Sequence, residues 1–146
     1  MKAMEKVKVT TLDALTPLIG KKVIVDPFIS GNDKCDLDEQ RLDVDYIILT
    51  HGHEDHFGDV VELANRNHAT VIGCAEIAGY LSTYHGVENV RGMNIGGKAE
   101  LDFGSVKYVQ AFHSSSYTHE NGIPVIILPS EWFVILNELY EDFKDF

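Results

Sequence analysis

The chain has 146 residues, of which 45% are hydrophobic, and this length and composition indicate one globular domain. Its formal net charge of −11 argues against a protein that coats DNA or RNA, because such proteins usually present a basic patch. A nuclease is not excluded, since bound divalent ions reverse the local charge at an acidic site. We therefore expect a small-molecule substrate and no nucleic-acid partner.

Cysteine usage and the N-terminal sequence bear on where the protein works. Cys35 and Cys74 form no C-x-x-C pair, so we expect two reduced thiols, with Cys74 buried in the apolar run "VIGCAEIAG". Glu5 and Asp13 interrupt the N-terminal sequence, which argues against a signal peptide. No stretch approaches the ~20 apolar residues of a membrane span. These features favour a cytoplasmic protein without membrane contact.

Strand and helix patterns alternate in the first part of the chain. Apolar, β-branched runs predict strands at residues 21–28, 45–50 and 69–73. Helical spacing predicts a helix that begins after Asp59, a possible N-cap, and a second helix over 75–86 that ends at Gly86. This alternation favours a layered α/β domain.

The rest of the chain is dominated by strand patterns. We predict strands at residues 90–94, 99–103 and 105–113, the last two joined as a hairpin at Gly104 and Ser105. In the tail, Ser130 is a possible N-cap, and apolar residues from Trp132 to Phe143 fall at helical spacing. We favour a helix there, although "WFVIL" also suits a strand.

The stretch "LTHGHEDHFGD" (residues 49–59) concentrates potential metal ligands directly after a predicted buried strand. In an extended loop, His51 and His53 can converge on one point, while Asp55 and His56 can reach a second. The loop lies at the carboxyl end of its strand, where α/β sheets usually build sites. Imidazole and carboxylate groups suit zinc, iron or manganese. Four potential ligands within six positions therefore predict a metal site rather than a solvated polar loop.

Other candidate groups carry weaker signals. A serine nucleophile has little support because no G-x-S-x-G motif is present, and "NIGGK" is typical of a turn rather than a phosphate-binding loop. Loop backbone is the expected partner of the serines that follow His113, namely Ser114, Ser115 and Ser116. Three histidines are expected at the surface without a metal: His68, His85 and His119.

The pattern T-H-x-H-x-D-H-x-G-D, from Thr50 to Asp59, resembles the signature of the metallo-β-lactamase superfamily. The segments "VIVDPF", "GVENVRGMNIGG" and "FGSVKYVQAFHSSS" resemble a bacterial family of predicted metal-dependent hydrolases within it. The resemblance covers roughly residues 21–124. It implies an αββα sandwich with the metal site at one edge of two packed sheets.

The same resemblance implies roles for individual residues. It assigns His51, His53 and His113 to a first metal ion and Asp55 and His56 to a second, with Asp55 also our candidate catalytic residue. It implies that Asp26 supports the metal loop, the stretch of residues 49–59. Zn²⁺ is the expected ion, with Mn²⁺ or Fe²⁺ as alternatives. A metal-activated water would then attack an ester, an amide or a phosphodiester.

The chain departs from the family after His113. The family's later aspartate motif is absent, and only His119 follows as a further histidine. We interpret residues 1–146 as a single partial domain, the N-terminal half to two-thirds of the sandwich, with residues 125–146 as a divergent tail of a truncated reading frame. We then expect at most one tightly held ion and weak or no activity. The alternative is a non-catalytic metal-binding fragment. An exposed sheet face would be covered by the tail or by a homo-oligomer.

Overall fold

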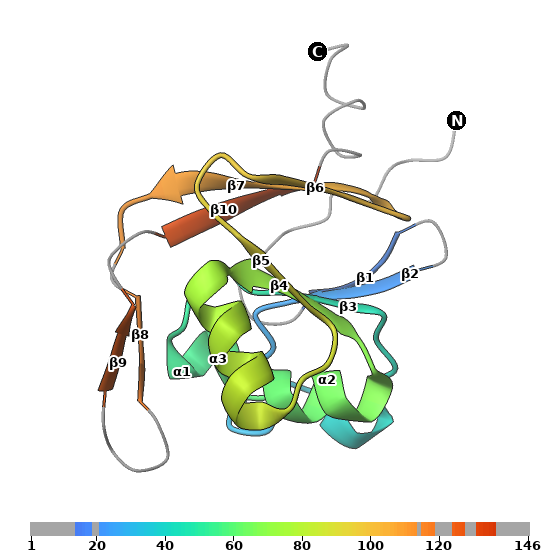
Figure 1. The fold of residues 1–146 in the computed structure, drawn as a ribbon. Helices are drawn as coiled ribbons and strands as arrows, with labels where there is room; N and C mark the ends of the chain where they lie inside the picture. The colour runs from blue at the N-terminus through green and yellow to red at the C-terminus, as the bar shows by residue number, and fades with distance from the viewer. Residues whose placement is uncertain (1–13, 19–20, 114, 119–123, 128–130, 137–146) are drawn as a thin grey trace.

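The computed structural model describes residues 14–18, 21–113, 115–118, 124–127 and 131–136. Three helices cover one face of a five-stranded sheet, and a second, three-stranded sheet lies over the other face (Figure 1). This order of layers confirms the predicted mixed α/β class. Within the described residues, no helix has both the length and the apolar character needed to cross a membrane.

The first sheet and its helices come from the N-terminal part of the chain. The strand order is β1 (Ala14–Leu18), β2 (Lys21–Val25), β3 (Tyr46–Ile48), β4 (Thr70–Cys74) and β5 (Val90–Met93). Strands β2 to β5 are parallel, while β1 pairs antiparallel with β2. The helices are α1 (Glu54–Phe57), α2 (Val60–Asn67) and α3 (Ala75–His85), with a short 3₁₀ turn η1 (Glu39–Arg41). As predicted, Gly86 ends α3 in the left-handed conformation.

The second sheet comes from the C-terminal part of the chain. It contains β6 (Lys98–Leu101), β7 (Gly104–Ala111) and β10 (Glu131–Leu136), in the antiparallel order β10-β7-β6. A separate antiparallel pair consists of β8 (Ser115–Thr118) and β9 (Pro124–Ile127). The predicted hairpin between β6 and β7 is present, but its turn is formed by Asp102 and Phe103, because Leu101 pairs with Gly104.

The two sheets share one apolar core. Ile47 and Ile72 from the first sheet and Val106 and Tyr108 from the second are all fully buried in the same cluster. Their burial shows that β6 and β7 cover the face of the first sheet opposite the helices. Burial of this kind is the main favourable term in folding, about 25 cal/mol per Å² of apolar surface.

The helix predicted from Ser130 is wrong for residues 131–136. These residues form β10, which pairs along β7 from Glu131 opposite Ala111 to Leu136 opposite Val106. The aromatic and β-branched run "WFVIL" suits a strand, and β7 offers the hydrogen-bonding edge that a helix would have left unpaired. Ser130 itself and residues 137–146 lie outside the described part of the chain.

The metal loop also differs from the predicted extended form. Residues 51–53 belong to no helix or strand and His53 is extended, but a helical turn, α1, begins at Glu54, with His53 at the N-cap position. Asp55 and His56 are therefore carried by a helix. Strands β1, β8 and β9 and the turn η1 were not predicted either, because short segments give little periodic signal.

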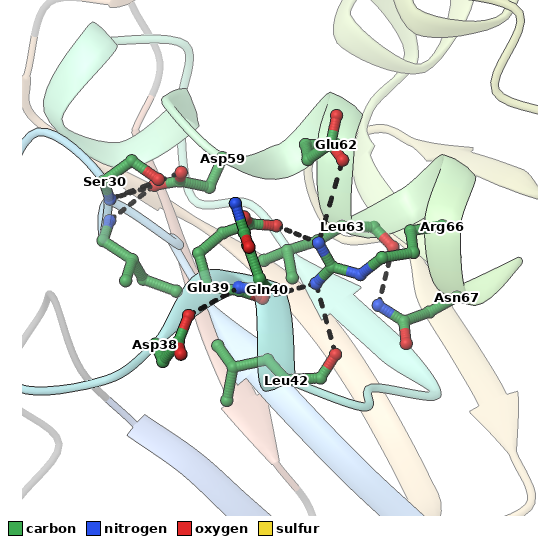
Figure 2. A network of polar contacts seen from close by, with 11 residues as sticks. Ser30, Asp38, Glu39, Gln40, Leu42, Asp59, Glu62, Leu63, Arg66 and Asn67 are labelled. Carbon is green, nitrogen blue, oxygen red and sulfur yellow. Dashed lines mark hydrogen bonds and ion pairs between the residues drawn. The ribbon is translucent and has the colours of Figure 1, made fainter.

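Polar contacts of two residues, Asp59 and Arg66, hold the long connection between β2 and β3 against α2 (Figure 2). Asp59, which precedes α2, accepts hydrogen bonds from the backbone N–H groups of Ile29 at 2.5 Å and Ser30 at 3.1 Å. It therefore stabilises this connection instead of capping its own helix through its side chain. On α2 itself, Arg66 donates to the Leu42 carbonyl at 3.3 Å and pairs with Glu39. This connection includes Asp26, which lies in the candidate site.

Candidate metal centre

The candidate site lies where segments following three strands meet. Asp26 follows β2, His51 and His53 follow β3, and His113 comes two residues after the end of β7. Because β2 and β3 are parallel, their carboxyl ends share one edge of the first sheet. The second sheet brings the end of β7 to the same edge, so the site draws on both sheets.

Three of the predicted ligands converge. Nitrogen atoms of His51, His53 and His113 lie within 4.8 Å of one another. The ring centroids are 4.6 Å apart for His51–His53, 5.0 Å for His51–His113 and 5.1 Å for His53–His113. His51 is buried, His53 is half-buried and His113 is exposed, so the set has an inner side and an open side.

The spacing of these nitrogens fits a tetrahedral metal ion. His51 Nε2 lies 2.9 Å from His53 Nδ1, so these two potential ligand atoms face each other. Two nitrogens bound to zinc at about 2.0–2.1 Å in tetrahedral geometry lie roughly 3.3 Å apart. The pair would need to separate by only a few tenths of an ångström. Burial, and next the nearby His56, lower the pKa of His51 to about 4, which keeps its imidazole in the neutral, metal-binding form.

Thr50 fixes which nitrogen of His51 is available to a metal. Its Oγ1 lies 2.6 Å from Asp26 Oδ2 and 2.9 Å from His51 Nδ1. The Thr50 hydroxyl has a single proton, which it donates to Asp26 Oδ2. The hydroxyl oxygen then accepts from Nδ1–H of His51. This tautomer leaves the lone pair on Nε2, the atom that faces His53.

Asp26 supports the metal loop, as predicted, and also contacts His56 directly. Its Oδ2 lies 3.0 Å from His56 Nδ1, and its Oδ1 accepts from the Thr50 N–H at 2.7 Å. Asp26 is fully buried and holds a left-handed φ of 49°. Non-glycine residues at positive φ cluster at functional sites. Asp26, His51 and His56 form a second group of potential ligands, but the hydrogen bonds that Asp26 accepts favour a supporting role.

Asp55 lies at the margin of the site. Its Oδ2 is 3.9 Å from His56 Nε2, and its side chain is 62% exposed. Among the described residues, it belongs to neither of the two groups of converging ligands. Asp55 and His56 both lie on α1, beside the three histidines. Asp55 does not join their set of converging ligand atoms.

The remaining candidates lie elsewhere or outside the described residues. His68 is an exposed residue in the left-handed conformation at the end of α2, and His85 ends α3. His119 and Ser114 fall outside the described residues, while Ser115 and Ser116 belong to β8. Thr50 was missed as a site residue by sequence reasoning. Its position directly before the first histidine, after a buried strand, was the available signal.

Helices on one sheet, a second sheet packed on the other face and histidines at the shared edge are features of the metallo-β-lactamase fold. The family model described as "Metallo-beta-lactamase superfamily" matches residues 18–139. The chain belongs to this superfamily. The match extends past residue 124, where the resemblance seen in the motifs ends.

Similar proteins carry hydrolase names. The chain is 88% identical over 108 residues to a "UPF0173 metal-dependent hydrolase" of Staphylococcus haemolyticus and 77% identical over 107 residues to one of Staphylococcus aureus. These alignments cover 74% and 73% of this chain and 47% of each relative. The chain thus spans about half the length of the curated relatives it matches. A solved structure, Igni18, described as a novel metallo hydrolase from Ignicoccus hospitalis, shares 27% identity at a TM-score of 0.58, covering 81% of this chain and 49% of that one.

Proposed function

We propose that this chain is a metal-dependent hydrolase that holds a divalent ion at His51, His53 and His113. The observation that carries the proposal is the convergence of three imidazoles, from segments following β3 and β7, on one point. The names of the relatives support it. We propose an ester, an amide or a phosphodiester as the bond that is cleaved. The net charge of −11 favours a small-molecule substrate over a nucleic acid.

Zn²⁺ is the ion that this ligand set favours, with Mn²⁺ or Fe²⁺ as alternatives. Three histidines with an open position form the ligand set of a catalytic zinc site. The chemistry that such an ion supplies is activation of a water molecule near neutral pH and polarisation of the substrate oxygen. Thr50 and Asp26 hold His51 in the tautomer that this chemistry requires.

We assign proton handling to Asp55 and a supporting position to His56. The Asp55 carboxylate is exposed beside His56 Nε2, at a separation of 3.9 Å, so it can take up a proton on the open side of the site. Asp55 and His56 also offer two ligand atoms, a carboxylate oxygen and an imidazole nitrogen, to a second metal ion. Two protein ligands are too few for tight binding, so we propose one tightly held ion per chain.

A second candidate function is a non-catalytic metal-binding fragment. It is favoured by one observation, that the chain spans about half the length of its relatives. The two candidates share the metal centre and differ in turnover. Hydrolysis by this chain therefore separates them, whereas metal content does not.

The test combines metal analysis with hydrolysis assays on the full chain. After loading with Zn²⁺ or Mn²⁺ and dialysis, we expect about one equivalent of metal and slow hydrolysis of generic phosphodiester or thioester substrates. His113→Ala should lose both. His68→Asn is the matched control, because it removes an exposed histidine at a left-handed position that asparagine tolerates.

The outcomes of these assays test the number of bound ions, the candidate function and the three-histidine centre separately. Two retained equivalents would contradict the single tight site. Metal binding without turnover under any condition would favour the non-catalytic fragment. Equal metal binding by His113→Ala and the unaltered chain would refute the three-histidine centre.

A further inference from the structure

The metal centre depends on how the two sheets sit on each other. His51 and His53 follow β3 in the first sheet, whereas His113 follows β7 in the second. Among the described strands, every ladder of backbone hydrogen bonds joins strands of the same sheet. The separation between His113 and the other two histidines is therefore set by packing and by side-chain contacts between the sheets.

Tyr108 makes such a contact next to the metal loop. From β7, its hydroxyl donates to the Leu49 carbonyl at 2.5 Å and lies 3.1 Å from the Ile72 carbonyl. Leu49 directly follows β3 and precedes Thr50 and His51. The Leu49 N–H bonds to the Ile72 carbonyl at 2.9 Å, so Tyr108 binds the point where the pairing of β3 with β4 ends.

Tyr108 is held firmly at its backbone as well. Its N–H donates to the Gly97 carbonyl at 3.0 Å, and its carbonyl accepts from the Gly96 N–H at 2.9 Å. The side chain is fully buried. Burial raises the pKa of the Tyr108 phenol well above its ordinary value, so the hydroxyl keeps its proton and remains a donor. A rigid residue thus joins β7 to the base of the metal loop.

A second tyrosine provides an internal comparison. Tyr46, at the start of β3, donates from its hydroxyl to Asp102 Oδ1 at 2.5 Å, in the turn between β6 and β7. Tyr46 also packs edge-on against Phe103. This contact joins the same two sheets at the end of β3 that lies away from the metal loop. Removing either hydroxyl breaks hydrogen bonding between the sheets, but of the two tyrosines only Tyr108 contacts Leu49, the residue before Thr50.

We propose that Tyr108 is a positioning residue of the metal centre: its hydroxyl holds the Leu49 carbonyl and so sets His113 against the His51–His53 pair. This inference rests on the proposed metal centre and deepens it. A phenylalanine would fill nearly the same volume in the core. A buried hydroxyl is unfavourable unless it is bonded, so its presence here needs the specific partner that Leu49 provides.

The test compares three variants of the full chain. Tyr108→Phe removes the bond beside the metal loop, and Tyr46→Phe removes the bond at the far end. Val106→Ala creates a cavity at a fully buried position on β7, two residues from Tyr108, as a control for lost stability. For each we would measure Zn²⁺ affinity by competition with a chromogenic chelator, the visible spectrum of bound Co²⁺ and the melting temperature without metal.

We expect Tyr108→Phe to lower Zn²⁺ affinity by about ten-fold or more and to change the Co²⁺ spectrum. Tyr46→Phe and Val106→Ala should leave both unchanged, although Val106→Ala lowers the melting temperature. Unchanged affinity and spectrum in Tyr108→Phe would overturn the proposal. So would equal losses in Val106→Ala, or a Tyr108→Phe chain that fails to fold, since the hydroxyl would then serve the fold as a whole. Failure of the unaltered chain to bind Zn²⁺ would refute the metal centre itself.

Discussion

The Oδ2 atom of Asp26 lies 3.0 Å from Nδ1 of His56, across a separation of 30 residues in the sequence. Asp26 is a carboxylate acceptor, so His56 presents Nδ1–H to it and keeps the lone pair on Nε2. The same oxygen accepts from the Thr50 hydroxyl, which orients His51. One buried carboxylate therefore sets the tautomers of two histidines on the metal loop.

Asp26→Asn should weaken metal binding while preserving the fold. Asparagine has nearly the same size and tolerates the left-handed φ of 49°, but its amide cannot replace two carboxylate acceptors. We expect a loss of about 10- to 100-fold in Zn²⁺ affinity, measured by competition with a chelator. Asp43→Asn is the control, because Asp43 is an exposed partner of Lys22. Equal Zn²⁺ affinity in the two variants would contradict the role of Asp26.

Thr50 can be tested with a matched pair of substitutions. Thr50→Val keeps the shape but removes the hydroxyl between Asp26 and His51, so Nδ1 of His51 loses its acceptor. We expect Zn²⁺ affinity to fall by about ten-fold in Thr50→Val and to stay near that of the unaltered chain in Thr50→Ser. The tautomer of His51, followed by the ¹⁵N chemical shifts of its ring, should become mixed only in the valine variant. A single Nδ1–H tautomer in Thr50→Val would show that Thr50 does not select it.

Sequence patterns predicted the parts of the fold that depend on local signals. The helix ending at Gly86 and the strands from β2 to β7 follow from periodicity and turn residues. The tail could not be settled in this way, because the run from Trp132 favours a strand only when β7 lies beside it. The spacing of apolar residues within one segment does not show which distant segment it pairs with.

The same division holds for the candidate site. His51, His53 and His56 stand within one motif, and the family resemblance added His113. The hydrogen bonds of Asp26 depend on the approach of the segments after β2 and β3, and that of Tyr108 on the packing of the two sheets. These contacts join residues 24 and 59 positions apart, and no sequence period reports them. Supporting residues were therefore harder to predict than the ligands themselves.

Cys74 should resist thiol reagents in the folded protein. It is buried, and burial raises the pKa of its thiol from 9.0 to about 11, which keeps the reactive thiolate scarce near neutral pH. Cys35 is only half-buried. Labelling with a thiol reagent at pH 8, followed by mass spectrometry of the peptides, should show modification at Cys35 first. Cys74 should react only when guanidinium unfolds the chain. Equal labelling rates in the folded state would contradict the burial of Cys74.

Two glycines should respond in opposite directions to alanine. At Gly79, within α3, an added Cβ meets nothing within 4 Å, so Gly79→Ala should raise the free energy of unfolding by about 0.4–1 kcal/mol.

At Gly97, an added Cβ would lie 2.7 Å from the Asn94 carbonyl oxygen, which accepts a hydrogen bond from the Gly97 N–H. The turn would have to shift, and with it the Gly97 carbonyl that binds Tyr108. Gly97→Ala should therefore lower the free energy of unfolding by about 1–3 kcal/mol. Denaturant titrations of both variants check the two signs, and a Gly97→Ala chain as stable as the unaltered one would show that this turn accommodates a side chain.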